Sequence, residues 1–192
     1  MHSLTLALAL LAATPALDND FVLVTRDRTV CAAPAPNCGV RVIVALEDVA
    51  LESGSSRQRL GRGDVAVFGA TDSYAIAQDS GFFEVVIKSG HPRAIAPAER
   101  IEPEKNALRH DGGDFFIFEE KLEPGDTRAR HSHSQRVVIQ LNRTRLQQWP
   151  DGAPEIFVET VPERPTFSPP VIHKVRNVGD APLRGIVIEF KP

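Results

Sequence analysis

Three histidines are the residues whose types and spacing point most directly to chemistry. His131 and His133 are separated by one serine, and His173 follows forty positions after His133. Side chains two apart on an extended strand project from the same face, so His131 and His133 aim two imidazoles at one point. A third imidazole from a distant strand completes a set of nitrogen ligands for a divalent transition metal. The pattern does not choose among zinc, iron, manganese, nickel and copper.

The strand that carries the histidine pair has no carboxylate after the pair. If the strand continues unbroken, alternate residues share one face, which predicts that the following residues lie together: His131, His133, Gln135, Val137 and Ile139. Gln135 is then a weak, neutral candidate for a fourth ligand. Three neutral imidazoles leave the double charge of the ion uncompensated, so we expect the site to attract an anionic ligand.

Two arginines continue the same alternation. Arg143 and Arg145 are candidate contacts for an anionic substrate at the open end of the site, and solvated rim charges are the alternative interpretation. A formal net charge of −3 and the lack of a basic stripe argue against nucleic acid as a partner. We therefore expect a small-molecule ligand, and a homodimer is compatible with the sequence.

Short β-rich segments must position these side chains. Runs of β-branched and aromatic residues, separated by Gly-, Ser- and Asp-rich turns, predict strands near residues 21–24, 41–46, 65–68, 83–87, 115–118, 136–141, 156–161 and 185–190. Fifteen prolines and thirteen glycines suit many short strands joined by turns. The sequence therefore predicts an all-β protein, with residues 93–109 as a Pro- and Ala-rich linker between two halves.

The two halves also share a sequence pattern. The segment 41–46 (RVIVAL) and the segment 136–141 (RVVIQL) lie 95 positions apart, and the strand opening at Phe21 maps onto Phe116 at the same offset. This indicates duplication of one domain. At that offset Pro36 and Cys38 take the places of His131 and His133, and at an offset of 98 Ala75 takes the place of His173. Metal binding is therefore expected in the second copy alone.

The histidine segments resemble the two motifs of the cupin superfamily. Residues 125–133 (GDTRARHSH) resemble the first motif, and residues 168–177 (SPPVIHKVRN) resemble the second. The resemblance covers roughly residues 110–190 directly and the remainder through the internal repeat. It implies a bicupin, with two antiparallel jelly-roll barrels. Residues 17–92 would form a degenerate cupin domain, and residues 110–192 the cupin domain with the metal-site histidines.

The sequence departs from the cupin pattern at one important position. Val137 and Val138 stand where the first motif normally has a glutamate, and Pro170 replaces a glycine of the second motif. Three functions remain open. The first is a dioxygenase-like or hydrolase-like metalloenzyme acting on a small anionic molecule. The others are a non-catalytic cupin that binds or senses a small molecule, and a structural protein with a relic metal site. Asn177 is expected to brace a turn through its side-chain amide.

The N-terminal segment and the cysteines concern localisation. An apolar run at 4–13, followed by Thr14-Pro15-Ala16, is typical of a secretory signal peptide over residues 1–16 and is too short to span a bilayer. No Lys or Arg precedes the run, so a buried first element is the alternative. In an exported protein, Cys31 and Cys38 are expected to form a disulfide, and unpaired thiols are the alternative. We expect a periplasmic or secreted protein, free of the membrane after cleavage, with the cytoplasm as the alternative.

Overall fold

The computed structural model describes residues 14–35, 38–77, 81–88 and 105–191, and within them it contains strands and turns without a helix. Accordingly, these residues include no helix of the length and hydropathy needed to cross a membrane. All strand pairings are antiparallel. The predicted all-β class is confirmed. Residues 1–13 of the expected signal peptide lie outside the described residues.

The first half of the chain forms eight short strands in the described residues. They are β1 (Leu17–Asp18), β2 (Val22–Arg26), β3 (Val40–Ala45), β4 (Val49–Ser53), β5 (Ser56–Leu60), β6 (Val65–Phe68), β7 (Ala75–Ile76) and β8 (Phe82–Ile87). They make a five-stranded sheet in the order β1-β2-β8-β3-β6 and a three-stranded sheet in the order β5-β4-β7.

Residues 105–191 of the second half form nine strands. They are β9 (Asn106–Asp111), β10 (Phe115–Leu122), β11 (Thr127–His133), β12 (Arg136–Gln140), β13 (Arg145–Pro150), β14 (Ile156–Glu159), β15 (Pro165–Ser168), β16 (Val171–Asn177) and β17 (Leu183–Phe190). One sheet has the order β15-β12-β17-β10-β9 and the other the order β11-β16-β13-β14. Strand β9 begins at Asn106, so it takes in the last four residues of the segment expected to be a linker.

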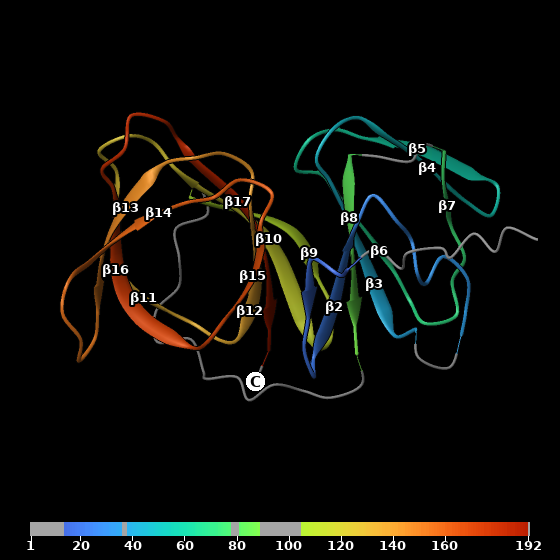
Figure 1. Cartoon of the computed structure of the whole chain (residues 1–192), viewed down its shortest axis with the longest axis horizontal. Coiled ribbons are helices and arrows are strands. Elements are labelled where there is room, and N and C mark those ends of the chain that lie inside the picture. Colours follow the sequence, from blue (N-terminus) through green and yellow to red (C-terminus); the bar gives the residue numbers. More distant parts are fainter. Residues whose placement is uncertain (1–13, 36–37, 78–80, 89–104, 192) are drawn as a thin grey trace, which may run out of the picture.

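The topology repeats as the sequence pattern indicates. The order β2-β8-β3-β6 in the first half has the same connectivity as β10-β17-β12-β15 in the second. The 95-residue offset places Arg41 of β3 on Arg136 of β12, and each arginine begins the pairing of its strand with the neighbouring edge strand. Each half is a double-sheet barrel, and the two barrels lie side by side (Figure 1).

The two barrels are joined through their five-stranded sheets. Val42 and Val44 of β3 and Val137 and Ile139 of β12 belong to one buried apolar cluster that both halves supply. Packing two sheets face to face in this way removes both apolar faces from water. At the edge of this contact Glu163 of the second barrel accepts hydrogen bonds from Arg26 at 2.7 Å and Arg62 at 3.0 Å.

The interiors of the two barrels differ. Side chains of β3 that point away from the shared cluster, Ile43 and Ala45, pack into a second apolar cluster with Leu51, Phe68 and Phe82. The second barrel instead encloses a cavity of about 310 Å³. Of the two barrel interiors, the second therefore has space for a small-molecule ligand.

The cysteines lie in the first barrel, in the loop between β2 and β3. Cys31 and Cys38 are bonded as a disulfide, with their Cα atoms 5.5 Å apart, and both are buried beside Val86. The backbone N–H of Cys31 donates to buried Glu84. The bridge closes a loop whose middle residues, 36 and 37, lie outside the described residues.

Candidate metal centre

Pairing of β11 with β16 brings the three histidines together. His131 lies directly opposite His173 in the register, and His133 lies two residues further along β11. A register shift between Arg128 and His131 precedes the pair, as a β-bulge commonly re-aims a side chain next to a site. The three side chains are buried, and one ligand nitrogen of each lies within 4.8 Å of the others.

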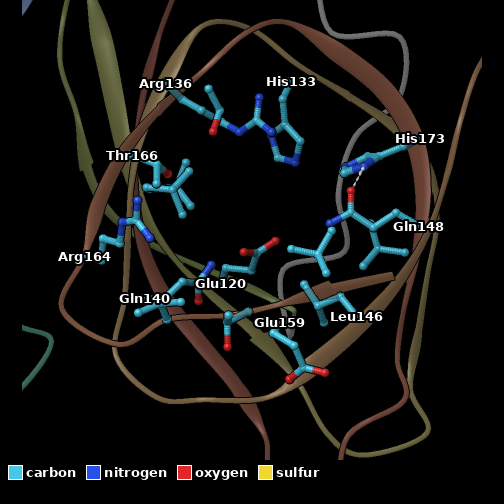
Figure 2. A pocket seen from close by; sticks show the side chains of 17 residues that line it. Glu120, His133, Arg136, Gln140, Leu146, Gln148, Glu159, Arg164, Thr166 and His173 are labelled. Atoms are coloured by element: carbon cyan, nitrogen blue, oxygen red, sulfur yellow. Dashed lines mark hydrogen bonds between the residues drawn. The ribbon is translucent and has the colours of Figure 1, made fainter. Parts of the chain in front are cut away.

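Each histidine is held by an oxygen atom at Nδ1. The Nδ1–H of His131 donates to the carbonyl oxygen of Ala129 at 2.7 Å. The Nδ1 of His133 lies 2.7 Å from the Oε2 of Glu189, and that of His173 lies 3.2 Å from the Oε1 of Gln148. Figure 2 shows the Gln148 contact. Oxygen partners at Nδ1 fix the ring orientation and leave Nε2 as the ligand atom.

The Nε2 atoms have the spacing of ligands on one ion. Those of His131 and His133 are 3.1 Å apart. Two nitrogens, each about 2.0–2.1 Å from a metal, lie roughly 2.9–3.4 Å apart at cis or tetrahedral angles. The Nε2 of His173 is buried and has no hydrogen-bond partner among the described residues. A buried, unpartnered imidazole nitrogen beside two others fits a metal ligand, so the three histidines predicted from sequence suit the group that they were expected to hold.

The surroundings keep the three imidazoles neutral, which is the form that binds metals. Burial lowers the pKa of His131. Burial, followed by the charge of Arg136, holds the pKa of His133 well below its ordinary value. Burial and the proximity of the other two histidines lower the pKa of His173 to about 2.

Glu189 is a carboxylate that sequence reasoning did not assign to the site. It lies on β17, where the register places it between Phe116 and Arg136. Its Oε1 accepts the backbone N–H of Ser134 at 2.8 Å while Oε2 meets His133. Burial raises the pKa of Glu189 to about 7. A lone acidic residue in the apolar segment 185–190 was the sequence signal that could have found it.

The expected alternation beyond the histidine pair is wrong. β11 ends at His133 and β12 begins at Arg136, and the two strands belong to different sheets. Because the chain turns from one sheet to the other between these strands, the alternation of side chains in β11 does not continue into β12. Arg136, Val138 and Gln140 line the cavity, while Val137 and Ile139 enter the core shared by the two barrels.

Gln135 lies in this corner. It is not one of the residues that line the cavity, and it is absent from the group of three possible metal ligands found in the described residues. Its side-chain oxygen is buried without a hydrogen-bond partner among those residues. The strand parity that suggested Gln135 as a fourth ligand does not hold in the structure.

The cavity beside the histidines carries charge of both signs. Figure 2 shows His133 and His173 with Glu120, Arg136 and Arg164 around it. Glu120, on β10, accepts a hydrogen bond from the buried guanidinium of Arg128. Burial alone would raise the pKa of Glu120, but the charge and hydrogen bond of Arg128, together with the charges of His133 and Arg136, hold that pKa below its ordinary value.

The arginines expected at the site lie elsewhere. Arg143 and Arg145 are exposed, and neither is among the residues that line the cavity. Arg145 pairs with Glu159 at 3.4 Å, and its guanidinium lies 4.9 Å from the centre of the Phe157 ring. Arg136 and Arg164 do line the cavity. Arg136 was not singled out because the alternation was counted from His133 into a different strand, and Arg164 lies between β14 and β15, where strand alternation gives no signal.

Asn177 has the role expected from its sequence context. Its side-chain Nδ2 donates to the carbonyl oxygens of Leu122 and Ala181, each at 2.9 Å. Its Oδ1 accepts from the Thr144 hydroxyl at 2.8 Å and the Gly179 N–H at 3.1 Å. This amide ties together the chain segments that follow β10 and β16, away from the ligand nitrogens.

Comparison with known proteins concerns the fold. No protein-family model and no curated protein matches the chain. Among solved structures, oxalate decarboxylase from Bacillus subtilis at pH 4.6 has a TM-score of 0.57 at 12% identity, over 92% of this chain and 73% of that one. The Cupin 2 conserved barrel domain protein from Leptotrichia buccalis has a TM-score of 0.56 at 12% identity, over 91% and 86%.

A third similar structure is AerE from Microcystis aeruginosa, with a TM-score of 0.55 at 15% identity, over 89% of this chain and 86% of that one. Identities this low bear on architecture and leave activity open. The likenesses span both barrels, as the coverage of each comparison shows. The expectation of a cupin protein is confirmed at the level of fold: this chain has the cupin fold, built as two jelly-roll barrels.

Proposed function

We propose that the second barrel is the active barrel of a metal-dependent enzyme that acts on a small anionic molecule. His131, His133 and His173 would hold a divalent transition metal through their Nε2 atoms. The observation that carries the proposal is the 3.1 Å separation of the Nε2 atoms of His131 and His133, while the Nδ1 atom of each ring is occupied by an oxygen partner. Two bare nitrogens at this distance are stabilised by a cation that both of them bind.

A bound ion would supply a Lewis acid for a substrate oxygen, or would acidify a water molecule. The protein's own residues do the rest. Glu189 and Gln148 orient two of the rings. Arg136, which donates to the carbonyl oxygens of Ser134 and Pro169, adds positive charge to the wall beside His133. An anion is therefore favoured over a cation at this end of the cavity.

The first barrel supports the active one mechanically in this proposal. Its interior is filled with apolar side chains such as Ile43, Leu51 and Phe82. Among the described residues, the group that could hold a metal ion is the three histidines of the second barrel. We therefore propose that the first barrel is a degenerate cupin domain whose five-stranded sheet braces the sheet that carries Glu120, Arg136 and Glu189.

A second function, binding without turnover, is favoured by one observation. Val138 faces the cavity at the position where the cupin motif has its glutamate, so that strand offers no proton acceptor. In this alternative the barrel captures a small anion and releases it unchanged. Incubating the metal-loaded protein with candidate carboxylates separates the two functions. An enzyme converts the carboxylate into a product, whereas a binding protein leaves it chemically unchanged.

Metal analysis tests the shared part of both functions. We expect protein purified without a histidine tag to contain close to one equivalent of a transition metal, or to bind one upon reconstitution. His131→Ala should abolish this binding. The matched control is His110→Gln. His110 lies in β9, stacks on Phe115 of β10 and is outside the group of three histidines. Less than about a tenth of an equivalent after reconstitution would instead favour a structural protein with a relic site.

Localisation remains a proposal as well. We propose export to the periplasm or the exterior, supported by the disulfide between Cys31 and Cys38, because such bonds persist in oxidising compartments. Detection of the protein in the periplasmic or culture fraction, with residues 1–16 removed, is the expected result. A cytoplasmic protein that retains those residues would contradict it.

A further inference from the structure

The cavity has a second polar region, on the five-stranded sheet that faces the histidines. Glu120 of β10 is paired in register with Gly185 of β17, and Gly185 is paired with Gln140 of β12. These three residues form one row across the sheet, and the Glu120 and Gln140 side chains line the cavity (Figure 2). We call Glu120, Gly185 and Gln140 the polar row.

In the backbone register, the polar row lies two rows of the sheet away from Glu189, the partner of His133. Arg136, which pairs with Glu189 beside the histidines, precedes Gln140 by four positions on β12. Four residues of a strand span about 13 Å along the backbone, but the Glu120 carboxylate lies close enough to His133 and Arg136 for their charges to contribute to lowering its pKa. The row between them consists of Val138 paired with Val187, and both line the cavity. A ligand that reaches from one end to the other must therefore cross an apolar belt.

The polar row presents hydrogen-bond acceptors that the protein leaves open. The Oε1 of Gln140 is buried and has no hydrogen-bond partner among the described residues. Arg128 binds one oxygen of Glu120, Oε1, and no described residue places a donor on the other. An unpaired buried acceptor destabilises the folded protein, so a ligand that donates a hydrogen bond to it offsets that cost.

Gly185 makes this arrangement sterically possible. A Cβ atom at position 185 would lie 2.8 Å from the Oε1 of Gln140. With glycine at that position, the Gln140 amide lies over β17, on the side toward Glu120. Arg164 and Glu159 also line the cavity but are exposed residues of opposite charge, so together they add no strong preference for either sign.

We propose that the polar row selects the far end of the ligand. The ligand would be a short-chain carboxylate whose acid group lies at the histidines and whose other end, across an apolar spacer, carries a hydrogen-bond donor such as an ammonium or hydroxyl group. This inference rests on the proposed metal centre. It adds to that proposal the chemical class of the ligand and two residues, Glu120 and Gln140, that determine specificity.

Three carboxylates of equal length test the class. The zinc-loaded, full-length protein is titrated by calorimetry with three ligands that differ in the group at the far end of the chain. This group is a hydrogen-bond donor in 5-aminopentanoate, a methyl group in pentanoate and a second carboxylate in glutarate. We expect 5-aminopentanoate to bind about tenfold tighter than pentanoate or more, since hydrogen bonds to charged groups have this size. Equal affinity for these two, or tightest binding of glutarate, overturns the proposal.

Two variants test the residues. Gln140→Leu removes an unpartnered buried oxygen and keeps the side-chain volume, so we expect it to fold and to lose several-fold in affinity for 5-aminopentanoate alone. Glu120→Gln should reduce the preference over pentanoate about tenfold. Glu159→Gln, a carboxylate of the same cavity that pairs with Arg145 at its rim, is the matched control.

The zinc content of each sample separates the two proposals. A sample that holds zinc but does not distinguish 5-aminopentanoate from pentanoate refutes the polar row as a specificity site and leaves the metal centre standing. Failure of the protein to hold zinc or any other transition metal after reconstitution refutes the metal centre and this inference together. Unchanged preference in both Gln140→Leu and Glu120→Gln would show that the row is not the recognising element.

Discussion

Glu189 and His133 are 56 positions apart in the chain, yet the Oε2 of Glu189 lies 2.7 Å from the Nδ1 of His133 in the buried wall of the second barrel. Strand β17 carries Glu189 to this place because it lies between β10 and β12 in the sheet that faces the histidines. A carboxylate on the distal nitrogen of a ligating imidazole holds the ring in position and increases its basicity. The pair is therefore the contact through which the larger sheet influences the metal centre.

We expect Glu189→Ala to lower zinc affinity by about 10- to 100-fold, because loss of such a partner has this effect in zinc sites. Glu189→Gln keeps an acceptor oxygen for the Nδ1–H of His133 and should lose less. Competition with a chromophoric chelator measures both. An alanine variant with the affinity of the unaltered protein would show that the contact does not orient the ligand.

Val137 and Val138 are adjacent in β12 but face opposite sides of the sheet, so we expect the same substitution to have opposite effects on stability at the two positions. Val137 is fully buried between the barrels, so Val137→Glu places an unpaired charge in an apolar core and should cost several kcal/mol of unfolding free energy. Val138 lines the cavity, so Val138→Glu should fold. It should also raise metal affinity severalfold by adding an anionic group. Urea denaturation and metal titration measure the pair, and equal destabilisation would contradict the assigned faces.

Asn177 should be important for stability and neutral for metal binding. Its amide is fully buried and makes hydrogen bonds to Leu122, Thr144, Gly179 and Ala181. Asn177→Ala leaves several buried groups unpaired, so we expect a loss of about 2–4 kcal/mol of unfolding free energy. Urea denaturation of the zinc-free protein measures the loss. A large drop in zinc affinity without a change in stability would argue for a direct role at the site.

The ion pairs between the barrels should make stability depend on pH. Burial alone would raise the pKa of Glu163, but the hydrogen bonds and charges of Arg62 and Arg26 together outweigh burial and hold that pKa below its ordinary value. A carboxyl group with a lowered folded-state pKa stabilises the fold above its unfolded value of about 4.3, and this stabilisation disappears as the pH falls through the folded-state value.

Glu163→Gln tests this dependence. At pH 7 we expect the variant to lose about 0.5–1 kcal/mol, the usual range for partly exposed pairs. The difference from the unaltered protein should shrink as the pH falls below about 4.3 and should disappear once the pH is below the folded-state pKa of Glu163, where that carboxyl group is also uncharged. Urea denaturation at several pH values provides the measurement. A difference that stays constant from pH 7 to pH 3 would assign the effect to packing rather than to charge.

The sequence by itself determined the class of fold and the set of candidate metal ligands. Alternating β-branched runs bounded by glycine, proline and aspartate require only local physics, so the strands near 41–46 and 136–141 were predicted close to their observed positions. The pair His131 and His133 shares one strand, and a period of two within a strand is a local property. The repeat at 95 positions likewise predicted two barrels with one connectivity.

Only the tertiary structure decided what surrounds the histidines. Glu189, Gln148 and Glu120 reach the site from β17, β13 and β10, and the register between strands distant in sequence is set by the packing of whole sheets. The alternation counted from His133 failed at Gln135 because the chain changes sheets at that point, and a single break in a period of two exchanges the two faces. Residue spacing therefore identified the three candidate metal ligands, whereas sheet register determined their carboxylate partner and the shape of the cavity beside them.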